Sequence, residues 1–136
     1  MRVFVYFNLH KKVWSIKALE GSDKGRVIAH EGFVVLANAR PRVSEAGRQR
    51  VLREKRKNVH AGLVGEWLNP FEGSLITAKH MDDAYEPNRI TYNPYKYTTF
   101  VYKNNPTEHW QGSNLACMYA EDRGIITFDT EFREEK

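Results

Sequence analysis

The amino-acid sequence predicts an α+β fold, in which an antiparallel β-sheet of six to eight strands carries one basic helix. Three observations lead to this prediction. The length of 136 residues suits one domain and is too short for two ordinary ones, so residues 1–136 are treated as a single domain. Short runs of β-branched and aromatic residues alternate with turn residues along most of the chain. One segment, residues 44–58, is instead rich in helix-forming residues.

The N-terminal third is typical of an antiparallel meander. Residues 2–8 alternate as a strand, residues 9–12 form a polar turn, and residues 13–19 alternate as the partner strand. Residues 26–38 predict one or two further strands, with Gly32 as the bulge or break. Because the connections are short, consecutive strands are expected to pair antiparallel.

The C-terminal half returns to strand-like composition. Strands are expected within residues 59–68, 74–81 and 90–102, and a final hairpin over 115–120 and 124–129. The third of these regions is dense in Tyr and Thr, is interrupted at Asn93-Pro94, and is expected to end at Asn104-Asn105-Pro106. A loop is expected at residues 109–114.

Residues 44–58 are predicted to form the helix. Pro41 is expected to break the preceding strand pattern, and Ser44 is a favourable N-cap residue. At helical spacing, Arg50, Arg53 and Lys57 form a cationic stripe opposite a thin apolar arc. The helix is therefore expected to dock on the sheet with a basic outer face.

Positive charge is concentrated in this part of the chain. Residues 40–57 hold eight basic and two acidic residues, a balance of +6, whereas the whole chain carries +4, so the remainder sums to −2. Such concentration favours an anionic partner, although charge runs are commonly only solvated surface. Arginine groups at helical spacing bind phosphates by charge-assisted hydrogen bonds. The ligand-binding candidates here are Arg48, Arg50, Arg53, Arg56, Lys57 and His60.

Aromatic residues are the second signal for ligand binding. Five aromatic side chains lie within residues 92–102, and at least half of them must belong to the core. Those beside polar breaks are candidates for a pocket rim on which a nucleobase could stack. These candidates are Phe100, Asn104, Trp110 and, in a tight turn, Arg123.

Enzyme signatures are missing from the sequence. It contains no Gly-rich phosphate loop of the GxxxxGK type, no GxSxG, no HExxH and no CxxC motif. The five histidines lack metal-ligand spacing, and Cys117 is the single cysteine, so no metal and no cofactor is expected. No stretch has the length of a membrane span, and the strand pattern begins at the first residues. A cytoplasmic protein without catalytic activity and without a membrane partner is therefore expected.

Two parts of the chain support a family resemblance. Residues 43–51 and 56–61, together with Asn8-Leu9-His10-Lys11 and Trp14-Ser15, resemble small uncharacterised proteins of tailed-phage genomes. The size and layout also resemble the first anti-Thoeris family of phage sponge proteins. That resemblance implies a non-catalytic homo-oligomer that traps cyclic ADP-ribose signals or cyclic oligonucleotides in the infected host. It assigns no binding residue in this sequence, so the sites named above rest on their chemistry alone.

Three functions stay open on the sequence. The first is a sponge that sequesters a nucleotide-derived signal, for which Arg would hold the phosphates and aromatic faces the base. The second is a DNA- or RNA-binding phage protein that uses the basic helix on phosphates. The third is a small nuclease or nucleotide-processing enzyme with His60 or His109 as general base.

Overall fold

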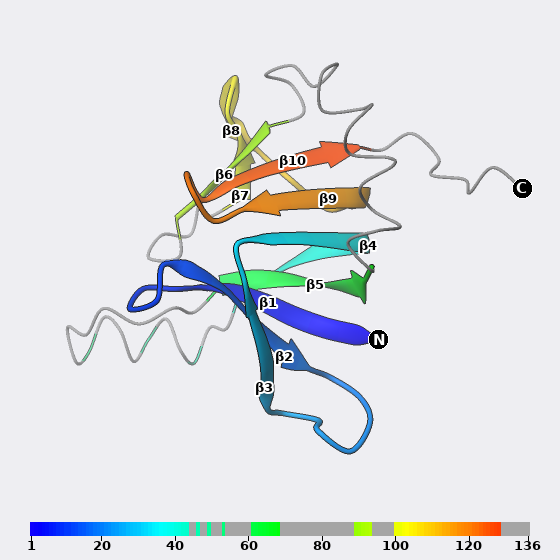
Figure 1. Cartoon of the computed structure of the whole chain (residues 1–136). Helices are drawn as coiled ribbons and strands as arrows, with labels where there is room; N and C mark the ends of the chain where they lie inside the picture. Colours follow the sequence, from blue (N-terminus) through cyan, green and yellow to red (C-terminus); the bar gives the residue numbers. More distant parts are fainter. Residues whose placement is uncertain are drawn as a thin grey trace, which may run out of the picture.

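The computed structural model describes residues 1–43, 46, 49, 53, 61–68, 89–93 and 100–128. Ten strands make up this part of the chain (Figure 1). They are β1 (Arg2–Asn8), β2 (Val13–Ala18), β3 (Val27–Glu31), β4 (Phe33–Val43), β5 (Ala61–Trp67), β6 (Arg89–Tyr92), β7 (Phe100–Tyr102), β8 (Asn105–His109), β9 (Ser113–Tyr119) and β10 (Gly124–Phe128).

All ten strands belong to one antiparallel sheet with the order β3-β2-β1-β5-β4-β9-β10-β6-β7-β8. The prediction of an α+β fold with a basic helix is therefore wrong, since no helix is among the elements that the structure describes. Of residues 44–58, only Ala46, Gln49 and Arg53 are described; each has helical backbone and an exposed side chain. The described part of the chain is all-β because the sheet alone buries the hydrophobic core.

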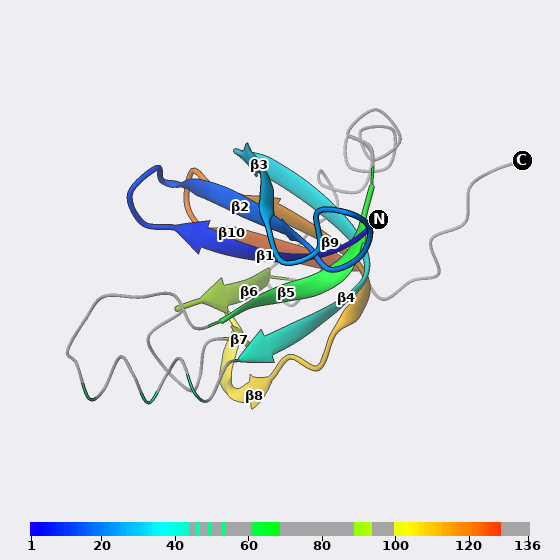
Figure 2. The ribbon, with the colours of Figure 1, turned by 90° about the horizontal axis from the view of Figure 1, so that it is seen from below.

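The sheet curls so that its two halves pack face to face (Figure 2). Five strands separate β2 from β6 in the sheet order, yet the rings of Trp14 and Tyr92 lie 5.3 Å apart in an edge-to-face contact. The contacts extend through Phe7, 5.4 Å from Trp14, and Phe100, 5.6 Å from Tyr92. Edge-to-face aromatic pairs add to the stabilisation from burial. We call the face that carries this core the inner face, and the opposite one the outer face.

Several predicted strands are confirmed. Residues 2–8 form β1, and Gly32 separates β3 from β4. The predicted final hairpin is β9 and β10, although β9 begins earlier, at Ser113. Residues 74–81 lie outside the described part of the chain.

The predicted break at Pro41 is wrong, because this proline lies within a strand. Strand β4 continues through Pro41, which pairs with Leu63 of β5. On the side of β4 that faces β9, Pro41 has no partner, because the last β4–β9 pair is Ala39 with Ser113. A residue without an N–H donor is tolerated at such an edge. The predicted end of the 90–102 region is confirmed, since β7 ends at Tyr102. Pro106 lies in the next strand, β8, which is the last strand of the described sheet order.

A β-bulge interrupts β4 opposite β5. Ala37 pairs with Glu66 and Arg40 with Val64, so Asn38 and Ala39 together face the single residue Gly65. Asn38 has a left-handed backbone with φ of 51°, which asparagine tolerates better than most residues. A Cβ atom at position 65 would lie 2.8 Å from the Ala37 carbonyl oxygen, so glycine is required there.

Candidate functional site

The bulge determines which side chains of β4 reach the outer face. Leu36 and Ala39 both point into the core, whereas regular alternation from Leu36 would place positions 38, 40 and 42 there. The extra residue shifts the alternation by one, so Arg40 and Arg42 lie on the outer face and are exposed. Two arginines that an ordinary strand would bury are thereby available to solvent.

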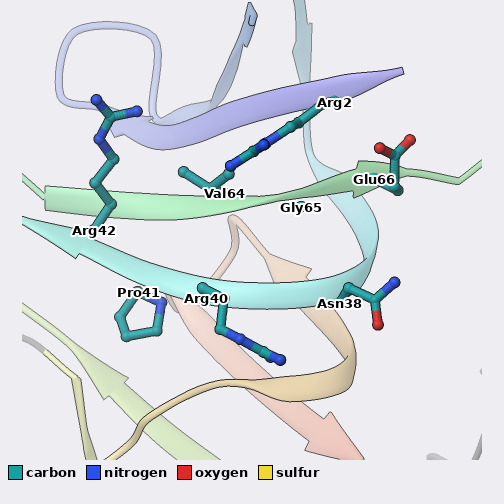
Figure 3. Close-up of a pocket in the computed structure, with 8 residues that line it drawn as sticks. All are labelled: Arg2, Asn38, Arg40, Pro41, Arg42, Val64, Gly65 and Glu66. Carbon is teal, nitrogen blue, oxygen red and sulfur yellow. The ribbon is translucent and has the colours of Figure 1, made fainter.

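A pocket of about 580 Å³ lies on the outer face over β1, β5 and β4 (Figure 3). Figure 3 shows the side chains of Arg2 and Arg42 reaching over β5 from opposite sides, while Arg40 extends from β4 on the side away from β5. The lining residues are Arg2, Asn38, Arg40, Pro41, Arg42, Val64, Gly65 and Glu66. Its size is within the range of small-molecule sites, about 300–1,000 Å³.

Arg40 is held in place by backbone groups. Its Nη1 donates to the carbonyl oxygen of Ala39 at 2.9 Å and to that of Ser113 at 3.5 Å. The side chain packs on Gly112, where an added Cβ would lie 2.6 Å from the Arg40 Cδ and where φ is 123°. This guanidinium group is therefore pre-positioned, which reduces the entropy lost on binding.

The cationic groups of the pocket lack carboxylate partners among the described residues. Arg2 faces Glu66 across the β1–β5 pair, but Glu66 Oε2 lies 3.2 Å from the α-amino group of Met1. Arg42 instead lies near an aromatic ring, with its Cζ 5.8 Å from the centroid of Phe4. Because like charges repel each other, an anion bound between these cationic groups would stabilise the arrangement.

The structure describes only part of the sequence-predicted site, so the site as a whole stays a prediction. Arg48, Arg50, Arg56, Lys57 and His60 lie outside the described residues, and Arg53 is exposed. Phe100 and Trp110 are 4% and 2% exposed and pack against each other in the core, with ring centroids 6.0 Å apart. From these positions neither ring can stack on a ligand without a rearrangement of the core.

The remaining two candidates lie in separate turns. Asn104 is exposed in the turn between β7 and β8. Arg123 lies between β9 and β10 with a left-handed φ of 54°, and its Cζ is 5.8 Å from the ring of Phe7. Arg123 thus contacts a core aromatic at the end of β1.

Two nucleophilic side chains lie too deep to meet a substrate. Ser15 Oγ is 3.0 Å from His30 Nδ1 and accepts a hydrogen bond from Asn8 at 3.2 Å, but Ser15 is fully buried. The contact therefore links β2 to β3. Burial raises the pKa of the Cys117 thiol to about 12, so its reactive thiolate form is scarce at neutral pH. His109, a candidate base, is exposed at the end of β8.

Over the described part of the chain, no three His, Cys, Asp or Glu residues are grouped closely enough to hold a metal ion. Within the described residues, no helix has the length and apolar character needed to cross a membrane.

Comparison with known proteins gives a close relative. The family model described as Mycobacterium phage L5 gene 82 protein matches residues 1–125. The Gene 82 protein of Mycobacterium phage L5 is 46% identical over 131 residues, which cover 92% of this chain and 94% of that protein. This chain belongs to the L5 gene 82 family. The resemblance to small phage proteins is thus confirmed, whereas the comparisons do not support the likeness to the anti-Thoeris sponges. No solved structure matches.

Sequence reasoning missed the pocket of this gene 82 family member, although signals for it were present. The alternation in residues 2–8 places Arg2, Phe4 and Tyr6 on one face of a strand. Arg40 and Arg42 were counted within the basic segment but were assigned no role. The pairing of β5 between β1 and β4, which brings these side chains together, has no local sequence signal.

Proposed function

We propose that this phage protein binds a phosphate-bearing, nucleotide-derived ligand in the outer-face pocket and sequesters it without chemical change. The observation that carries the proposal is a pocket of about 580 Å³ lined by Arg2, Arg40 and Arg42, in which Arg2 and Arg42 reach over β5 and Arg40 is held by backbone carbonyl groups (Figure 3). Arginine is well suited to phosphate, because its planar group donates two parallel hydrogen bonds. Such a sponge would act in the cytoplasm of the infected host.

The absence of catalysis is part of this proposal. Phosphate binding needs cationic donors, whereas turnover needs a nucleophile, a base or a metal near the scissile bond. The pocket-lining side chains offer arginines, an asparagine and one carboxylate. The carboxylate of Glu66 is paired with the α-amino group of Met1 at 3.2 Å.

The binding test uses the full chain and native mass spectrometry against cyclic ADP-ribose isomers and cyclic di- and trinucleotides. Replacement of Arg2 and Arg42 by Gln should weaken binding at least about tenfold, since charge-assisted bonds contribute roughly 1.5–3 kcal/mol each. Arg26→Gln is the matched control, because Arg26 is equally exposed but lies in the turn before β3. Equal affinities for both variants and the wild type would remove the pocket from the proposal.

Sequestration is tested by recovery of the ligand. After incubation and heat denaturation, a sponge returns the ligand intact, and chromatography of the supernatant detects any product. Linear product that disappears in His60→Ala or His109→Ala would establish the enzyme alternative instead. Replacement of Arg50, Arg53 and Lys57 by Gln tests whether the basic segment adds to the site, and at least about a tenfold loss is expected if it does.

A second candidate, single-stranded nucleic-acid binding, is favoured by the aromatic side chains on the outer face beside the pocket. Phe4 and Tyr6 lie there with ring centroids 6.0 Å apart, and Lys17 pairs with Phe4 across β2. Salt dependence separates the two candidates. A protein that contacts six or more phosphates should lose about 10³-fold in affinity between about 50 and 200 mM salt, whereas a two-phosphate pocket should lose far less.

A further inference from the structure

The aromatic ring of Phe4 packs over β5 beside the cationic pocket. Phe4 is on the outer face of β1, partly buried, and its ring crosses Gly62 of β5. A Cβ at position 62 would lie 2.8 Å from the Phe4 Cζ and 2.9 Å from Cε1. Only a residue without a side chain therefore allows the ring to rest on the β5 backbone. The result is an aromatic surface at the level of the sheet.

Two neighbours extend this surface. The ring of Tyr6 lies 6.0 Å from that of Phe4 with an interplanar angle of 30°, a nearly parallel arrangement. On the side of the pocket, the Arg42 guanidinium lies 5.8 Å from the Phe4 centroid. Aromatic and guanidinium planes are the two kinds of side-chain surface on which nucleobases stack in proteins.

The distance from this surface to the phosphate donors suits one nucleotide. Arg2 and Phe4 are two residues apart on the same strand and face, a rise of about 6.7 Å. Arg42 contacts Phe4 and also lines the pocket, so the two features are continuous. A ligand with a base and a phosphate on one sugar would occupy both at once.

We propose that Phe4, Tyr6 and Arg42 form a nucleobase-stacking subsite next to the phosphate pocket, so that the ligand is recognised as a nucleotide. This inference rests on the proposed function, because the subsite is defined by its position beside the phosphate donors. It adds a requirement that phosphate binding alone does not make, namely that the ligand carry a planar base.

The test compares ligands with and without a base on the intact chain. Wild-type protein, Phe4→Leu and Phe4→Trp are titrated calorimetrically with ADP, cyclic di-AMP and an oligothymidylate, and with pyrophosphate and ribose 5-phosphate as base-free probes. Phe4→Leu should weaken binding of the base-containing ligands at least about fivefold, the lower end of measured stacking contributions. It should change binding of the base-free probes less than about twofold, and Phe4→Trp should retain nucleotide binding.

Phe33→Leu is the matched control. Phe33 is also a partly buried aromatic, but it lies at the other end of β4, where its ring is 4.9 Å from Tyr119. The control should leave all affinities unchanged. If Phe4→Leu fails to fold, Phe4→Trp provides the comparison, since a larger aromatic plane should hold or raise nucleotide affinity without affecting pyrophosphate.

Each remaining outcome overturns a different statement. Parallel losses for nucleotides and base-free probes would show that Phe4 only shapes the pocket, and the subsite would be rejected. Unchanged nucleotide affinity in Phe4→Leu would also reject the subsite while leaving phosphate binding intact. Failure of wild-type protein to bind any probe would reject the proposed function itself. Preference for cyclic di-AMP over the oligothymidylate would identify a small signal as the source of the nucleotide, and the reverse preference a polynucleotide.

Discussion

The hydroxyl group of Tyr92 links the two halves of the curled sheet, and its removal is a stringent test of the fold. Tyr92 lies on β6 and is buried. Its hydroxyl donates a hydrogen bond to the carbonyl oxygen of Ala61 at the start of β5 and accepts one from the backbone N–H of Phe7 at 3.4 Å. One atom of the C-terminal half therefore contacts two strands of the N-terminal half.

The expected cost of Tyr92→Phe follows from these contacts. The ring is kept, so the substitution opens no large cavity, and the edge-to-face contact with Trp14 is preserved. The Ala61 carbonyl loses a buried donor, which costs about 1–3 kcal/mol, and the long bond from Phe7 adds little. A loss of about 2 kcal/mol in the free energy of unfolding is expected, with a fall in Tm of roughly 6–8 °C for a domain of this size.

Urea denaturation followed by circular dichroism measures this loss, with thermal melting as the second readout. Tyr6→Phe is the control, since Tyr6 lies on the outer face and is partly exposed; its stability should stay within about 0.5 kcal/mol of wild type. If Tyr92→Phe were as stable as the control, the contribution of the Tyr92 hydroxyl to holding the two halves of the sheet together would be rejected.

Three further perturbations test other parts of the structure. Gly62→Ala should destabilise the fold by about 3 kcal/mol or prevent folding, because its Cβ would clash with the backbone oxygen of Val5. Gly32→Ala meets nothing within 4 Å and should be nearly neutral, so equal urea midpoints of the two variants would contradict this expectation. Asn38→Val should cost about 1–2 kcal/mol because a β-branched residue disfavours the left-handed backbone, and Asn38→Gly should not; similar melting temperatures for the two would argue against the bulge. Burial raises the pKa of Cys117 from 9.0 to about 12, so between these pH values the folded chain keeps a proton that the unfolded chain releases. The free energy of unfolding should therefore fall by about 1 kcal/mol per pH unit above about pH 9. The urea midpoint of Cys117→Ala should decline less steeply with pH than that of the wild type, and parallel declines would be inconsistent with a buried thiol.

The local elements of this protein can be predicted from its amino-acid sequence. Residues 2–8 form a strand because alternation of apolar and polar side chains is a property of neighbouring residues, and Gly32 separates two strands for an equally local reason. The concentration of basic residues from Arg40 onward was also visible, because charge depends only on composition. Local composition wrongly predicted a strand break at Pro41. A proline is tolerated within a strand where no neighbouring strand requires its N–H donor, and this depends on the long-range pairing.

The class of the fold and the position of the site depend on long-range contacts, which no local pattern reveals. The curling of the sheet, which buries Phe100 and Trp110, results from contacts between strands that are far apart in sequence. The outward direction of Arg40 and Arg42 depends on one extra residue in the bulge, and a shift of one position exchanges the two faces of a strand. The pocket then forms because β5 pairs with both β1 and β4. This pairing joins segments that are far apart in sequence, so no single segment predicts it.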